Sequence, residues 1–138
     1  MTRFLDTNIL VYAEDRDDGD KHRRAIELMQ DLWEREDGVL SIQVLQEFFV
    51  TITRKVRKPI KTENAAKIIE QYLSWQVVEN TGVLLLKAID RMSAHHLSFW
   101  DSLIVEAAVS AGCDVLYSED LTHKQHFGHL QVINPFKE

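Results

Sequence analysis

Short apolar runs alternate with longer amphipathic stretches along the whole chain. The runs are rich in Val, Ile, Leu and Phe and are bounded by polar or turn-forming residues, which is typical of short buried strands. They predict five strands, at 3–6, 38–41, 77–78, 115–118 and 130–133.

The stretches between these runs carry apolar residues at spacings of three and four, which is the helical period. In the second stretch, for example, Ala25, Met29 and Leu32 share one face, and Glu27 and Asp31 lie on others. Helices are therefore expected at 9–12, 20–35, 42–57, 62–75, 83–97 and 99–111, with an acidic loop at 14–20.

Local signals predict where several of these helices begin and end. Asp20 and Thr62 are expected to be N-caps, because their side chains can accept a hydrogen bond from a free backbone N–H. Pro59 disfavours helical geometry in the residue before it, so the 42–57 helix should stop near this proline.

Strands separated by helical crossovers predict an α/β fold with a parallel sheet between two layers of helices. No stretch rich in proline, glycine or serine divides the 138 residues. We therefore expect one domain spanning 1–138, built as a three-layer α/β/α sandwich around about five short strands.

The charge balance restricts the class of partner. A net charge of −6 argues against simple adhesion to nucleic acid, which generally requires a basic face. One local cluster runs against this trend, and its residues are candidates for contact with an RNA backbone: Arg54, Lys55, Arg57, Lys58 and Lys61. The structural alternative is a solvated helix end, where cations favour the helix dipole.

The remaining composition predicts a cytoplasmic protein. No segment approaches the ~20 uncharged apolar residues of a membrane helix, and the amino terminus has no basic-then-apolar signal region. Cys113 is the single cysteine, so no internal disulfide can form and a reducing compartment fits best.

Four acids stand in apolar sequence that has no local use for a charge: Asp6, Glu47, Asp101 and Asp120. Asp6 and Asp120 lie at the carboxyl ends of predicted strands, the edge where α/β sheets bind ligands. Four converging carboxylates repel one another unless a cation compensates. An all-oxygen ligand set suits Mg²⁺, with Mn²⁺ as a substitute.

Each acid also has a structural alternative. Asp6 can cap the helix that follows it, and Asp120 can cap a turn beginning at Leu121. Glu47 can face solvent, and Asp101 can form a capping box with Ser98.

Several segments together resemble PIN domains, most closely toxins of the VapC type from bacterial toxin–antitoxin systems. They occur in matching order over essentially the whole chain: Phe4-Leu5-Asp6-Thr7-Asn8, Gln46-Glu47-Phe48, the segment from Leu97 to Ile104, Ser118-Glu119-Asp120-Leu121, and Val132-Ile133-Asn134-Pro135-Phe136. The resemblance implies a Rossmann-like sandwich and a metal-dependent endoribonuclease that leaves 5′-phosphate and 3′-hydroxyl ends.

The resemblance also implies roles for individual residues. Asp6, Glu47 and Asp101 match the three acids that surround the metal in the family, and Asp120 matches its more variable fourth acid. Three further residues match positions beside that site, two of them hydroxyls and the third in a supporting role: Thr7, Ser118 and Asn8. Toxins of this kind often have a glycine after the histidine of Glu-Asp-Leu-x-His, where this chain has Lys124 after His123.

The resemblance implies an antitoxin partner and a homodimer. Three other functions stay open: a PIN nuclease of RNA processing that is no toxin, a module that binds RNA or protein without cutting, and a phosphatase with Asp6 as nucleophile. The second acid of the phosphatase motif is replaced by Asn8.

Overall fold

A computed structural model describes residues 1–137. Its centre is a sheet of six strands in the order β3-β2-β1-β4-β6-β5. Five of these strands are parallel, and β5 pairs antiparallel with β6 at one edge. The strands are β1 (Arg3–Leu5), β2 (Gly38–Ser41), β3 (Gln76–Val78), β4 (Val115–Tyr117), β5 (His126–Phe127) and β6 (Leu130–Ile133).

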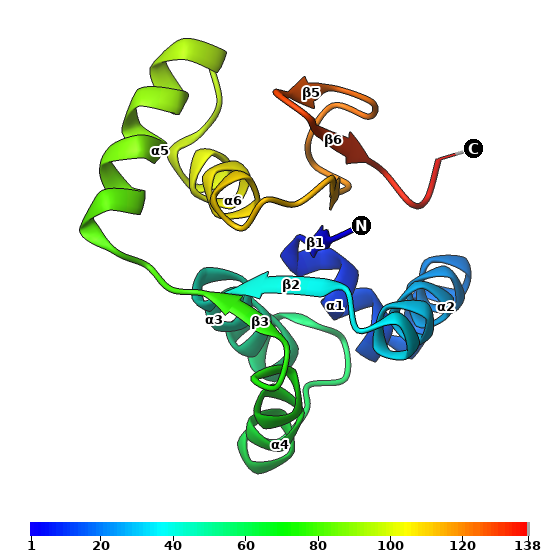
Figure 1. Cartoon of the computed structure of the whole chain (residues 1–138). Helices are drawn as coiled ribbons and strands as arrows, with labels where there is room; N and C mark the ends of the chain where they lie inside the picture. Colours follow the sequence, from blue (N-terminus) through cyan, green and yellow to red (C-terminus); the bar gives the residue numbers. More distant parts are fainter. Residues whose placement is uncertain (138) are drawn as a thin grey trace.

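Helices fill the crossovers between the parallel strands. They are α1 (Thr7–Glu14), α2 (Gly19–Arg35), α3 (Ile42–Val50), α4 (Thr62–Tyr72), α5 (Gly82–His95) and α6 (Phe99–Ser110), with a 3₁₀ turn at Arg16–Asp18 and a π-helical turn at Thr51–Lys55. The chain moves outward from β1 to β3 and then crosses back to β4, so right-handed crossovers place α1 to α4 on one face and α5 and α6 on the other. Figure 1 shows α5 and α6 packed together, away from α4. The α/β sandwich expected from the sequence is confirmed.

The core lies between the sheet and the helices on both of its faces. Phe4, Leu40, Leu116 and Val132 come from four neighbouring strands and are fully enclosed. Helix α6 is buried at every position from 102 to 108, because the sheet covers one side of it and α5 another. This explains why its sequence is apolar nearly all round.

Three local expectations were wrong. The strand β5 was missed, because His126 and Phe127 do not make an apolar run. Helix α2 begins at Gly19, with Asp18 rather than Asp20 in the N-cap position. Lys61 precedes α4 in the N-cap position and its side chain makes no capping hydrogen bond, so Thr62 is the first helical residue.

The expected helix at 42–57 is also more complicated than its sequence pattern indicates. Regular α-helix ends at Val50 and is followed by the π-helical turn Thr51–Lys55. The Thr53 hydroxyl donates to the Phe49 carbonyl at 2.7 Å, and Val56 N donates to Thr51 O at 3.2 Å, five residues back. A side chain that competes for a helix carbonyl in this way is a known cause of local distortion.

The direction of the chain reverses between the neighbouring strands β1 and β4. In open α/β sheets such a reversal opens a crevice between the carboxyl ends of the two strands. Asp6 follows β1 at this point, and Ser118 follows β4. No helix within residues 1–137 is both long and apolar enough to cross a membrane.

Candidate active site

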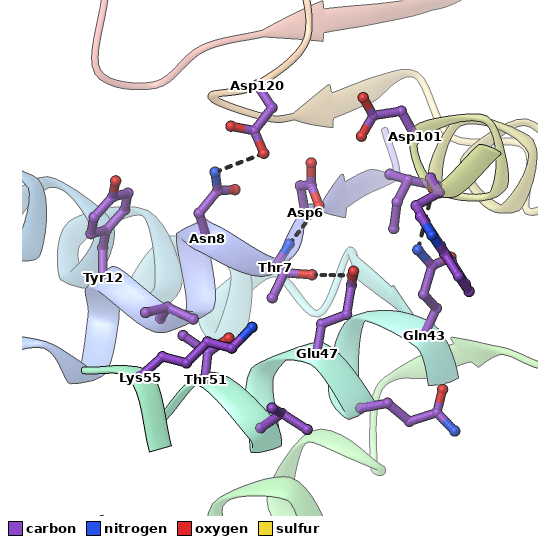
Figure 2. A pocket seen from close by; sticks show the side chains of 15 residues that line it. Asp6, Thr7, Asn8, Tyr12, Gln43, Glu47, Thr51, Lys55, Asp101 and Asp120 are labelled. Carbon is purple, nitrogen blue, oxygen red and sulfur yellow. Dashed lines mark hydrogen bonds between the residues drawn. The ribbon is translucent and has the colours of Figure 1, made fainter. Parts of the chain in front are cut away.

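A pocket of about 530 Å³ opens at this crevice and brings the four acids together. In Figure 2 the side chains of Asp6, Asp101 and Asp120 lie around one hollow, and Glu47 approaches it from α3. The lining residues come from α1, α3, the π-helical turn, α6 and the loop after β4: Asp6, Thr7, Asn8, Val11, Tyr12, Gln43, Gln46, Glu47, Val50, Thr51, Lys55, Trp100, Asp101, Ile104 and Asp120.

Asp6 holds the centre of the site and has a structural role as well. It is buried, with 5% of its surface exposed, and is the N-cap of α1, where its Oδ1 accepts from Thr7 N at 2.7 Å. Its Oδ2 accepts from the Ser118 hydroxyl at 2.8 Å. This second bond follows from the register of the sheet. Leu5 of β1 pairs with Tyr117 of β4, so the residues that follow them, Asp6 and Ser118, also lie side by side.

The side chain of Glu47 is oriented by Thr7, the first residue of α1. Its Oε1 accepts from the Thr7 hydroxyl at 2.8 Å, so α1 and α3 are joined beside the pocket. Because the side chain is only half-exposed and has a specific partner, the solvated-face alternative does not describe it.

Asp101 lies in the first turn of α6, but the cap is supplied by another residue. The Ser98 hydroxyl accepts from Asp101 N at 3.1 Å. Ser98 thus makes one half of a capping box, and the pocket is lined by the Asp101 carboxylate. The positive end of the α6 dipole favours the charge of this carboxylate.

The loop after β4 presents Asp120 to the pocket. The Ser118 hydroxyl accepts from the backbone N–H groups of Asp120 at 3.3 Å and Leu121 at 3.4 Å, so Ser118, rather than Asp120, closes the turn. The Asp120 side chain instead accepts from Asn8 Nδ2 at 3.3 Å. Asn8 therefore connects α1 to the fourth acid.

Electrostatics at the site favour a bound cation. Burial, and then the nearby charges of Asp120 and Glu47, raise the pKa of Asp6 to about 7, although Ser118 and Thr7 donate to it. Burial, and then repulsion from Asp101 and Glu119, also raise the pKa of Asp120. A positive ion placed among these groups would remove the repulsion between them.

The donors at the site fit a hydrated Mg²⁺ or Mn²⁺ ion. All are oxygens, and Asn8 Oδ1 is buried without a hydrogen-bond partner in a pocket that already holds four carboxylates. Within residues 1–137, no three His, Cys, Asp or Glu side chains converge tightly enough to enclose an ion by themselves. Mg²⁺ usually keeps several waters and takes only one or two protein carboxylates directly, so the open arrangement suits it.

The π-helical turn brings one basic residue to the acids. In a regular α-helix, residues four apart overshoot a full turn by ~40°, so successive members of the series 43, 47, 51 and 55 would drift away from the pocket. The wider π-helical turn reduces that drift, and both Thr51 and Lys55 line the pocket with Glu47. Figure 2 shows Lys55 beside Thr51, across the hollow from Asp120.

The other members of the predicted basic cluster lie elsewhere. Lys58 is 3.8 Å from Asp17 and borders a second pocket near the 3₁₀ turn. Arg54, Arg57 and Lys61 are exposed and line no part of the acid pocket. Only Lys55 is therefore placed beside the acids.

Sequence reasoning missed several lining residues. Gln43 is one turn before Glu47 on α3, and its buried side chain donates to the Trp100 carbonyl at 3.2 Å. Trp100 directly precedes Asp101, which was a usable signal. Tyr12 gave no such signal, because the hydrogen bond from its hydroxyl to Glu119 spans 107 residues.

Known proteins share this architecture. A model of the PIN domain family matches residues 3–126. No curated protein sequence matches the chain. Among solved structures, the chain is similar to VapC20 of Mycobacterium tuberculosis, described as a toxin that cleaves the sarcin-ricin loop. The identity is 21% and the TM-score 0.66, with 86% of this chain and 90% of that one covered.

Two further structures are similar over almost their whole length. A toxin–antitoxin complex from Klebsiella pneumoniae matches with TM-score 0.70 and 16% identity, covering 99% of this chain and 100% of that one. VapBC2 from Rickettsia felis, bound to a DNA fragment from its promoter, matches with TM-score 0.65 and 18% identity, covering 96% and 97%. At these identities the likeness establishes the fold.

Proposed function

Because the chain belongs to the PIN domain family, we propose that it is an endoribonuclease that hydrolyses RNA phosphodiester bonds with the help of Mg²⁺ or Mn²⁺. The observation that carries this proposal is the pocket at the β1/β4 crevice, where Asp6, Glu47, Asp101 and Asp120 meet. Such a concentration of carboxylates is suited to holding hard cations against a phosphate.

Some side chains would bind the metal ion, and others orient the carboxylates. One or two of the carboxylates of Asp6, Asp101 and Asp120 would bind the ion directly and the others would reach it through its waters. Ser118 fixes the orientation of Asp6 through its 2.8 Å hydrogen bond. The hydroxyl of Thr7 fixes the fourth carboxylate, Glu47. A bound divalent ion supplies a water of lowered pKa and neutralises charge on phosphate oxygens.

Hydrolysis then requires a water oxygen to attack phosphorus in line with the leaving 3′ oxygen, which takes up a proton. One product therefore carries a 5′-phosphate and the other a 3′-hydroxyl. A carboxylate of the cluster that lies beside this water can accept its proton as a general base. Lys55 is placed to hold a phosphate beside the cut.

We further propose that the protein is the toxin of a toxin–antitoxin pair and forms a homodimer in the cytoplasm. The similar structure from Klebsiella pneumoniae is described as a toxin–antitoxin complex, and that from Rickettsia felis as VapBC2 bound to a DNA fragment from its promoter. An antitoxin segment that enters the acid pocket would exclude RNA from the carboxylates.

The residue two positions after Asp6 argues against an aspartyl-phosphate mechanism. The second acid of the phosphatase motif is replaced by Asn8, whose side-chain amide donates to Asp120 at 3.3 Å. The two hydrogen bonds that Asp6 accepts, from Thr7 N and from the Ser118 hydroxyl, suit a ligand that must keep one orientation.

The test is cleavage of a mixed cellular RNA pool by the purified chain freed of any co-purified antitoxin. Reactions contain Mg²⁺, Mn²⁺ or EDTA, and Asp6→Asn and Asp101→Asn variants are run in parallel. We expect cleavage that requires metal and is lost in both variants. Persistent RNA binding by folded protein, with no cleavage in either metal, would instead indicate a binding module.

A further inference from the structure

Trp100 is the most exposed of the three tryptophans, and it lines the acid pocket directly beside Asp101. The exposed fraction of Trp100 is 61%, compared with 41% for Trp33, which packs with Trp75 and Tyr72 in a separate aromatic cluster. Exposing an indole ring to water is unfavourable, and here the exposed ring lines the pocket that holds the four acids.

Two contacts position Trp100, one through its ring and one through its backbone. The ring of Phe99 meets its ring edge-on, with centroids 5.0 Å apart and planes at 75°. The Gln43 side chain donates to the Trp100 carbonyl at 3.2 Å, which ties the start of α6 to α3. A tryptophan held in place loses little conformational freedom when a flat partner packs against it.

The charges of the pocket indicate why such a partner is needed. The chain has a net charge of −6, and the pocket contains four carboxylates but only one lysine, Lys55. Phosphate contacts alone therefore provide little of the attraction that most nucleic-acid-binding proteins use. Stacking of a base on an aromatic ring does not depend on charge and contributes substantially to binding of single strands.

We propose that Trp100 is the stacking platform for one unpaired nucleobase next to the scissile phosphate. This inference rests on the proposed function, because it assumes that RNA enters the acid pocket. It also defines the substrate class as RNA with an unpaired base at this position, in a single strand or a loop. In a continuous helix the faces of the bases are already covered by their neighbours.

A nucleobase fits this surface better than an apolar segment of a protein. An apolar segment that covered Trp100 would also have to cover Asp101 and the neighbouring carboxylates, removing them from water without a partner. A nucleotide avoids this cost, because its base covers the ring while its phosphate remains with the polar part of the pocket.

The experiment measures RNA binding without cleavage. In the full chain carrying Asp6→Asn, the affinity for a short single-stranded RNA is compared between Trp100, Trp100→Phe and Trp100→Leu. A second RNA series carries one abasic ribonucleotide, moved through each position. Thermal unfolding of the three proteins is compared to confirm equal folding.

We expect Trp100→Leu to bind the intact RNA about tenfold more weakly, while Trp100→Phe stays within about threefold of the parent. At one position of the abasic ribonucleotide, the difference in RNA affinity between the parent and Trp100→Leu should disappear. For a fully paired duplex of the same sequence, the three proteins should bind alike.

Equal affinity of the Leu variant and its parent for the intact RNA would overturn the stacking role and leave the proposed nuclease intact. A loss that persists at every abasic position would also overturn it, since the effect would then be structural. If the parent neither binds RNA nor, with Asp6 restored, cleaves it in Mg²⁺ or Mn²⁺, the proposed function fails together with this inference.

Discussion

At the scale of single residues, one strained backbone conformation lies in the loop that follows Asp120. Lys124, in the loop between Asp120 and β5, has a φ of 70°, in the left-handed region that side chains with a Cβ atom rarely adopt. The resemblance to VapC-type toxins predicts glycine at this position, and this chain has lysine in that conformation. Its N–H donates to Val132 O at 2.7 Å, which holds the loop against β6.

Replacing Lys124 by glycine should therefore stabilise the protein. Glycine adopts this φ without strain, and the backbone hydrogen bond to Val132 does not depend on the side chain. We expect the free energy of unfolding in urea to rise by about 0.5–1 kcal/mol. Relief of the backbone strain stabilises the folded state, and the greater freedom of glycine in the unfolded chain offsets part of this gain. Lys124→Ala, which keeps a Cβ atom, is the control and should give no such gain.

The raised pKa of Asp6 predicts how the stability of the metal-free protein depends on pH. The pKa is about 7 in the folded protein, against an ordinary value of 3.8. Between these values the folded state keeps the proton that the unfolded state has released. Stability should therefore fall as the pH rises from about 4 to about 7.

Asp6→Asn removes this charge and keeps an oxygen acceptor at the same place. With a chelator present, we expect a higher unfolding temperature for the variant than for the parent at pH 8, and a much smaller difference at pH 5. Ser93→Ala, at an exposed position of α5, is the control variant and should unfold at the same temperature as the parent at both pH values. A difference that does not change with pH would show that ionisation of Asp6 is not its cause.

At the scale of secondary structure, the π-helical turn after α3 separates one basic residue from the rest of its cluster. Arg54 and Lys55 are adjacent in sequence, yet only Lys55 lines the acid pocket. The sequence pattern could locate the cluster but could not rank its members, because that ranking depends on the winding of a single turn.

Lys55→Ala should consequently impair RNA cleavage more than Arg54→Ala does. A charge-assisted contact with phosphate typically contributes enough to change affinity about tenfold. We expect the KM for a short RNA to rise by about that factor for Lys55→Ala, and by less than about twofold for Arg54→Ala. Equal effects of the two variants would mean that the cluster acts only as a diffuse positive surface.

At the scale of the whole molecule, an apolar face of α5 lies open to solvent. The exposed fractions of Val83 and Leu86 are 64% and 65%, and Leu85 and Ile89 are also exposed. Contiguous exposed apolar residues on a folded chain mark contact surfaces. We predict that this face forms the interface of the proposed homodimer.

Leu86→Glu should weaken that dimer without unfolding the chain, because the side chain projects into solvent. We expect sedimentation of the purified protein to change from dimer to monomer at micromolar concentration. Leu73→Glu, an exposed position at the end of α4, is the matched control and should leave the dimer unchanged. A parent that sediments as a monomer would contradict the proposed interface.

The sequence predicted the architecture well and the details of the site less well. Apolar runs located the five parallel strands, most clearly β1 and β2, where burial at every position leaves a clear composition signal. The two-residue strand β5 gives no such signal, since its formation depends on pairing with β6. Asp6 and Asp120 could be placed at the edge of the sheet by topology, whereas Tyr12 and Gln43 enter the pocket only through long-range packing.

The reversal of chain direction between β1 and β4 has a practical consequence for controlling the protein. The segment 79–81, just before α5, is exposed and separates a first part containing Asp6 and Glu47 from a second part containing Asp101 and Asp120. Each part would contribute two of the four acids, and the bond from Ser118 to Asp6 joins them. Cutting the chain at 79–81 would therefore give two halves that have no nuclease activity when separate. If each half were fused to a protein that dimerises when a drug is added, the drug would bring the halves together and restore the nuclease.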